Sequence, residues 1–85
     1  MKELVLYSGA WCAPCKMLKN TLEELSKEGV EFTLENVDID ENPERTQKAR
    51  VRGVPTLHLV EDGKVVGSMI GNKTLTDLKV FMGIV

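Results

Sequence analysis

The chain has 85 residues, of which 42% are hydrophobic and 28% are charged. Eleven basic and thirteen acidic side chains give a net charge of −2, which argues against a nucleic-acid-binding protein, because such proteins usually carry a basic excess. No hydrophobic run approaches the roughly 20 residues that a membrane span needs, and the composition is not that of a disordered chain. We therefore expect one globular domain over residues 1–85, with a small core and no membrane or nucleic-acid partner.

The first half of the chain predicts strand, helix and strand. The apolar run at residues 3–7 is typical of a buried central strand. Residues 13–28 repeat leucines on one helical face, and Gly29 supplies the stop. Residues 30–34 alternate as a second strand, after which the apolar phase reverses. We expect this strand to bulge or end near Glu35 and Asn36.

The second half predicts a short helix, two strands and a last helix. Asn42 is expected to cap a helix over residues 43–50, which has proline at its first position. An Asp-Gly turn joins the expected strands 54–60 and 64–70. A capping-box pattern beginning at Thr74 opens the final helix. This order predicts an α/β fold whose first two strands are parallel, because a helix crosses between them.

The only two cysteines, Cys12 and Cys15, lie where the first strand meets the first helix. Free backbone N–H groups and the helix dipole at that position favour a thiolate on Cys12, the nucleophile of disulfide exchange. One turn later, Cys15 is expected to face inward and to resolve the mixed disulfide. Pro14 stiffens the turn between them, and Trp11 offers an apolar contact to substrates.

Other interpretations of the cysteine pair are less consistent with the sequence. A structural zinc site needs four ligands, and this chain offers only the two cysteines and His58. We expect His58 to be a packed or partly exposed strand residue and not a general base. A structural disulfide over so short a loop would constrain the unfolded chain little. A redox-active pair is therefore favoured. Lys16 either lowers the pKa of Cys12 or is a solvated residue of the first turn.

Four basic residues precede the third expected strand: Arg45, Lys48, Arg50 and Arg52. They form either a solvated helix face or a docking surface for an acidic reductase or substrate. In the second case, turnover with a partner should fall as salt is added.

Three motifs, taken in order, resemble those of the thioredoxin family: Trp11-Cys12-Ala13-Pro14-Cys15-Lys16, the segment 37–43, and Arg52-Gly53-Val54-Pro55-Thr56. Ala13 stands where glycine is usual, and Gly71 matches a family glycine. The resemblance covers nearly the whole chain and is to short members that lack an extra N-terminal strand and helix. It implies a thioredoxin fold of order β-α-β-α-β-β-α, with a four-stranded mixed sheet and helices on both faces.

The resemblance also implies a function. Val54–Pro55 would be a cis peptide lying against the cysteine pair, and the Val54 backbone would pair with an extended substrate strand. The activity would be reduction of protein disulfides, with electrons from a flavoprotein thioredoxin reductase and no bound cofactor or metal. We expect a monomer. The N-terminal residues lack the features of a signal peptide, so a cytoplasmic location is expected, although a mature secreted form would look the same.

Two residues depart from the family pattern. Leu6 occupies the position of a buried aspartate that is thought to exchange protons with the resolving cysteine, and Asn36 stands where its lysine partner is usual. The alternative resemblance is to glutaredoxins, favoured by the chain length and the missing acid but lacking their aspartate pair after Gly71. A third alternative is an interaction subunit in which the cysteines play no part.

Overall fold

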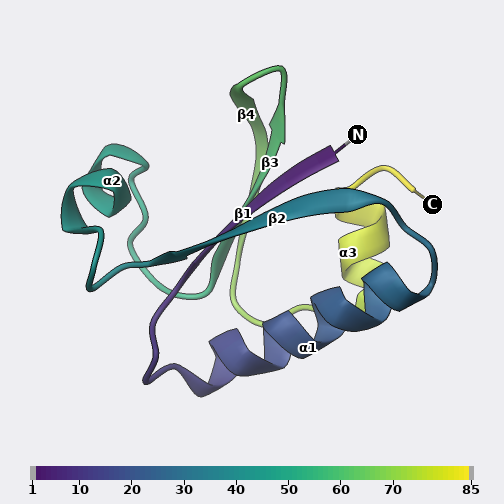
Figure 1. Cartoon of the computed structure of the whole chain (residues 1–85), viewed down its shortest axis with the longest axis horizontal. Coiled ribbons are helices and arrows are strands. Elements are labelled where there is room, and N and C mark those ends of the chain that lie inside the picture. Colours follow the sequence, from purple (N-terminus) through teal and green to yellow (C-terminus); the bar gives the residue numbers. More distant parts are fainter. Residues whose placement is uncertain (1, 85) are drawn as a thin grey trace.

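The computed structural model describes residues 2–84 and contains one four-stranded sheet and three helices within them. In chain order these elements are β1 (Lys2–Ser8), α1 (Ala13–Lys27), β2 (Phe32–Asp38), α2 (Pro43–Lys48), β3 (Thr56–Glu61), β4 (Lys64–Ile70) and α3 (Leu75–Phe81). The strand order is β2-β1-β3-β4, with β1 parallel to β2 and the other neighbours antiparallel. The predicted order of elements and the mixed sheet are confirmed (Figure 1).

The hydrophobic core lies between the sheet and two of the helices. Leu4 and Leu6 of β1 point to this side and belong to one core cluster with leucines of α1, with Leu78 of α3 and with Met82, which follows α3. Because neighbouring strand residues point to opposite faces, Val5 and Tyr7 face the other side, where they line a hollow with Arg45 of α2. In Figure 1, α2 accordingly lies apart from α1 and α3, across the sheet. Helices therefore cover both faces, as predicted.

The expected break in the second strand was wrong. β2 runs without a bulge from Phe32 to Asp38 and stays in parallel register with the whole of β1. The apolar phase changes because β2 contributes to both faces, with Phe32 packed against the core and Val37 buried on the opposite side. The irregularity lies instead in the hairpin, between Leu59 and Val60.

The structure also revises two local predictions at element boundaries. Asn42 is the N-cap residue of α2, but its side chain accepts no capping hydrogen bond. Its amide Nδ2 donates to the Asp38 carbonyl at 3.0 Å. β3 begins at Thr56 rather than at residue 54, since the two preceding residues belong to a loop. At α3 the capping box is confirmed: the Thr74 hydroxyl accepts from the backbone N–H three residues later, and the reciprocal bond is present.

None of the helices within residues 2–84 combines the length and the hydrophobicity that crossing a bilayer requires.

His58 of β3 is expected to make stability depend on pH. The residue is buried and its ring meets Tyr7 edge to face, with centroids 5.2 Å apart. Burial lowers the pKa of His58, so between that pKa and the unfolded value of about 6.5 the unfolded chain binds more protons. The free energy of unfolding therefore falls as the pH falls through this window. The total fall is about 1.4 kcal/mol for each unit by which the pKa of His58 differs between the folded and unfolded states.

Urea unfolding at pH 7.5 and 5.5 measures this effect. The decrease in unfolding free energy between these two pH values should be smaller for His58→Gln than for wild type. An equal loss in both proteins would contradict this.

Candidate active site

Cys12 and Cys15 form a disulfide at the start of α1, with Cα atoms 5.2 Å apart. Cys12 is the N-cap residue, and its Sγ accepts a hydrogen bond from the Cys15 backbone N–H at 3.2 Å. Both residues are buried, Cys12 at 5% exposure and Cys15 at 1%, so Cys15 is the more inward of the two, as predicted. Ala13, Pro14 and Lys16 are exposed in the first turn of the helix. The site thus places one sulfur at a helix N-terminus and the other behind it.

Trp11 lies on the surface next to the disulfide and is held there by two contacts. Its indole is 65% exposed, and its Nε1 donates to Asp40 Oδ2 at 2.9 Å. Gly9 approaches the indole so closely that a Cβ at this position would lie 2.7 Å from the ring. Asp40 follows β2, 29 residues from Trp11. The large exposed side chain of Trp11 is thus linked to the segment that follows β2.

The loop before β3 contains the cis peptide Val54–Pro55 that the family resemblance implied. The Pro55 carbonyl accepts from the Gly71 N–H at 2.8 Å, and the Thr56 hydroxyl donates to the Gly53 carbonyl at 2.6 Å. Gly71 adopts a φ of +90°, which favours glycine. Within residues 2–84, the Val54 backbone N–H and C=O bond to no other protein group.

Strand directions bring these pieces to one end of the sheet. β1 ends at Ser8 and leads to the cysteines, and β3, which is antiparallel to it, pairs Thr56 with Tyr7. The start of β3 and the end of β1 therefore lie at the same end, together with Gly71 after β4. Asp40 reaches this end from β2, on the other side of β1. The disulfide, the Val54–Pro55 loop and Trp11 thus share one end of the molecule.

Leu6 is completely buried in the leucine cluster beneath this end. Its register partner on β2 is Asn36, so no acid–lysine pair exists at these two positions. Asn36 takes part in an uncharged hydrogen bond instead, in which the buried Ser8 hydroxyl donates to Asn36 Oδ1 at 2.7 Å. Both departures noted in the sequence are therefore accommodated without a buried charge.

The basic cluster divides into two parts. Arg45 forms a bidentate ion pair with Glu35 of β2, at 2.5 and 2.7 Å, and this contact lowers the pKa of Glu35. Lys48, Arg50 and Arg52 have no ion-pair partner among residues 2–84. Arg45 thus links α2 to β2 at the surface, whereas the other three cations are exposed and without such a link.

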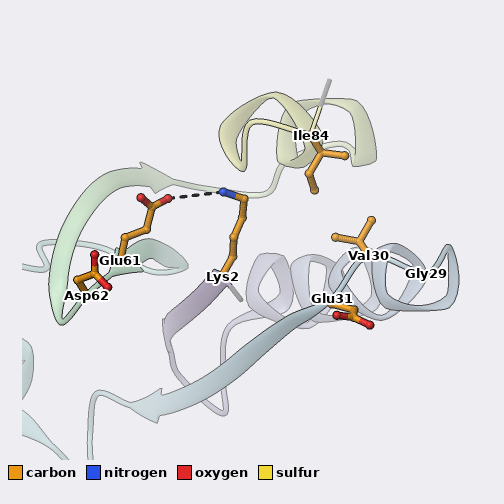
Figure 2. Close-up of a pocket in the computed structure, with 7 residues that line it drawn as sticks. All are labelled: Lys2, Gly29, Val30, Glu31, Glu61, Asp62 and Ile84. Carbon is orange, nitrogen blue, oxygen red and sulfur yellow. Dashed lines mark ion pairs between the residues drawn. The ribbon is translucent and has the colours of Figure 1, made fainter.

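One surface hollow lies far from the cysteines. Figure 2 shows it at the start of β1, where Lys2 pairs with Glu61 at 3.5 Å and the side chains of Val30 and Ile84 border it. β1 rises about 3.3 Å per residue, so this hollow and the cysteine loop are roughly 20 Å apart. It takes no part in the site. Within residues 2–84, no group of three or more potential metal ligands lies together.

Comparison with known proteins identifies the family. The model of the family described as Thioredoxin matches residues 1–83. The chain belongs to the thioredoxin family. A thioredoxin of Bacillus subtilis is 44% identical over 64 residues, which make up 74% of this chain and 62% of that protein. A thioredoxin of Rhodospirillum rubrum is 42% identical over 69 residues, 80% of this chain and 66% of the relative.

The fold is that of thioredoxins. The crystal structure of oxidised mitochondrial thioredoxin 3 from Saccharomyces cerevisiae aligns with a TM-score of 0.85 at 28% identity, covering 99% of this chain and 78% of the yeast chain. The matched part of this chain spans less than two thirds of the length of these curated thioredoxins. The thioredoxin fold predicted from the motifs is confirmed.

Two contacts of this site were not predicted from the sequence. The hydrogen bond from Trp11 to Asp40 joins residues 29 apart, and the segment 37–43 was recognised as a motif without a contact being assigned to it. The close approach of Gly9 to the indole was likewise missed. The only available signal was the glycine itself, two residues before a large aromatic side chain.

Proposed function

We propose that this protein is a thiol–disulfide oxidoreductase that reduces disulfides of other proteins by dithiol exchange at Cys12 and Cys15. The observation that carries the proposal is the disulfide at the N-terminus of α1, with Cys12 Sγ accepting from the Cys15 N–H. In the reduced protein, this hydrogen bond and the helix dipole stabilise a thiolate on Cys12. Membership of the thioredoxin family supports the same activity.

The reaction has two exchange steps. The Cys12 thiolate attacks one sulfur of a substrate disulfide, so that a mixed disulfide forms and the other substrate sulfur leaves as a thiolate. Cys15 then loses its proton and attacks Cys12 Sγ. The Cys12–Cys15 bond forms and the second substrate thiolate is released. Two electrons pass from the protein to the substrate, and neither step needs a metal or a bound cofactor.

Substrate binding is assigned to the surface around the disulfide. The free N–H and C=O groups of Val54 are proposed to pair with an extended substrate segment, held in place by Pro55 and by the hydrogen bond of Gly71 to the same loop. Trp11, whose Nε1 donates to Asp40, is proposed to provide an apolar surface next to Cys12. Ala13, Pro14 and Lys16 surround the exposed entrance to the cysteines.

The proposal extends to partners and location. Residues 1–85 would act as one domain and as a monomer, receiving electrons from a separate flavoprotein thioredoxin reductase. Substrates would be proteins that carry accessible disulfides. A cytoplasmic location fits this direction of electron flow, because thiols are kept reduced there.

The deciding experiment measures how the oxidised protein is regenerated. Insulin reduction is followed with NADPH and a thioredoxin reductase, and in parallel with NADPH, glutathione and glutathione reductase; mixtures without the protein are the controls. We expect sustained insulin reduction with the first system. Turnover with glutathione alone would favour the glutaredoxin alternative. Absence of turnover with both systems, for protein whose two thiols have been titrated, would refute the proposal.

A further inference from the structure

We propose that Lys48, Arg50 and Arg52, here called the basic wall, select protein disulfides that are flanked by acidic residues. This rests on the function proposed above and names a substrate class for it. The basic wall runs from the end of α2 into the loop that carries Val54 and Pro55. A substrate segment that pairs with the Val54 backbone would lie next to Arg52, which is two residues away in the same loop.

The charges of the basic wall are available to a ligand. Its three side chains are exposed, and none has an ion-pair partner in the stretch from residue 2 to residue 84. Glu44 lies one helical turn before Lys48 and lines a shallow hollow with it, so this acid weakens the field of Lys48. Arg50 and Arg52 are accordingly the principal contributors. In a chain of net charge −2, they form a local positive region.

The basic wall also borders a hollow that can receive substrate side chains. The hollow has a volume of about 630 Å³ and lies on the α2 side of the sheet, between residues 48–52 and strands β3 and β4. Thr56, His58 and the half-exposed Ile70 contribute to its lining. A peptide segment placed here contacts an apolar surface on one side and guanidinium groups on the other. Carboxylates suit these guanidinium groups through charge-assisted hydrogen bonds.

The opposite side of the cysteine site has the opposite charge. Asp40 and Glu41 follow β2, which lies on one side of β1, whereas the basic wall leads into β3 on the other side. This polarity favours one orientation of a substrate, with its acidic residues toward Arg52 and away from Asp40. It also disfavours substrates with acidic residues on both sides of the disulfide.

The test uses two synthetic peptides that share one disulfide and differ only in a flank of three glutamates or three glutamines. The fully reduced 85-residue protein is mixed with each peptide without a reductase, and the second-order rate of peptide reduction is measured at low and high ionic strength. We expect the glutamate peptide to react about tenfold faster at low salt, because several unscreened charges act over a few ångströms. The ratio should approach one at high salt.

Variants assign the effect to the basic wall. The double variant R50Q/R52Q should lower the ratio of the two rates to about twofold or less, and R50E/R52E should invert it. The matched control K27Q/K64Q also removes two exposed cations. Lys27 is the last residue of α1, at the end away from the cysteines, and Lys64 is the first residue of β4, at the β3–β4 turn. It should keep the wild-type ratio.

The outcomes separate the two proposals. Equal rates for both peptides with wild-type protein, or loss of the preference in K27Q/K64Q, would overturn the role of the basic wall and leave the proposed function intact. Failure to reduce either peptide would refute the proposed function itself. A preference that persists in R50Q/R52Q would place the acidic binding site elsewhere.

Discussion

Replacing Cys15 by serine is expected to leave the protein covalently joined to its substrates. Cys12 would still attack, because the helix N-terminus that stabilises its thiolate is unchanged, and the serine N–H at position 15 can still donate to Cys12 Sγ. The mixed disulfide would then have no internal thiol to resolve it. An external thiol at millimolar concentration replaces a pre-positioned one, which slows this step at least about a thousandfold. Incubation with an oxidised substrate protein should give an adduct with the summed mass of both chains.

Cys12→Ser is the matched control for this experiment. It removes the same atom type from the same turn, but it takes away the proposed attacking sulfur and should give neither turnover nor adduct. Non-reducing electrophoresis and intact mass spectrometry distinguish the two variants, and dithiothreitol should release the adduct. Sustained turnover by Cys15→Ser, or an adduct formed by Cys12→Ser through Cys15, would reverse the assigned roles. Unchanged partner binding in both variants would support an interaction subunit.

Much of the fold followed from local signals in the sequence. The leucine repeat and Gly29 located α1, and the Asp-Gly turn located the β3–β4 hairpin to within about two residues. The capping box at Thr74 was recognisable because both of its hydrogen bonds join residues only three apart. The cis peptide at Pro55 could not be predicted from local signals in this way. It was expected only from the family resemblance, since no local pattern specifies it.

The features that escaped prediction depend on contacts between distant residues. Asn42 has the residue type of a cap, yet its amide bonds to Asp38, whose position is set by the end of β2. The basic cluster appeared uniform in sequence, but Arg45 is paired with Glu35 of a neighbouring strand. A pattern of residue types indicates which groups are able to interact. Only the register and packing of the sheet decide which partner each one takes.

At Leu6, both the sequence and the structure show an apolar residue where the family resemblance implied a buried acid. This chain has a fully buried leucine, in one core cluster with Leu4 and leucines of α1, and an uncharged hydrogen bond between Ser8 and Asn36 nearby. An apolar side chain at this depth carries no desolvation cost. The consequence for the proposed mechanism is that Cys15 exchanges its proton without a carboxylate at this position.

Leu6→Asp is expected to destabilise the protein strongly, by about 4 kcal/mol or more at pH 7. The change removes buried leucine packing and places a carboxylate in a site whose register partner, Asn36, carries no positive charge. Burial should raise the pKa of the new carboxyl group above its unfolded value of about 3.9. Between these two values the folded state binds more protons, so the destabilisation should grow as the pH rises. Urea unfolding at pH 4.5 and 7 measures both effects.

Leu6→Asn separates the charge from the lost packing, because asparagine has nearly the same shape and does not ionise. The difference in unfolding free energy between the two variants should be small at pH 4.5 and larger at pH 7. Taking this difference cancels the titration of all other groups, because both variants contain them. Adding Asn36→Lys should then stabilise Leu6→Asp more than wild type, because it supplies the missing cation across the β1–β2 register. A pH-independent difference between the aspartate and asparagine variants would show that water reaches position 6, and that this position does not lie in a dry, leucine-lined interior.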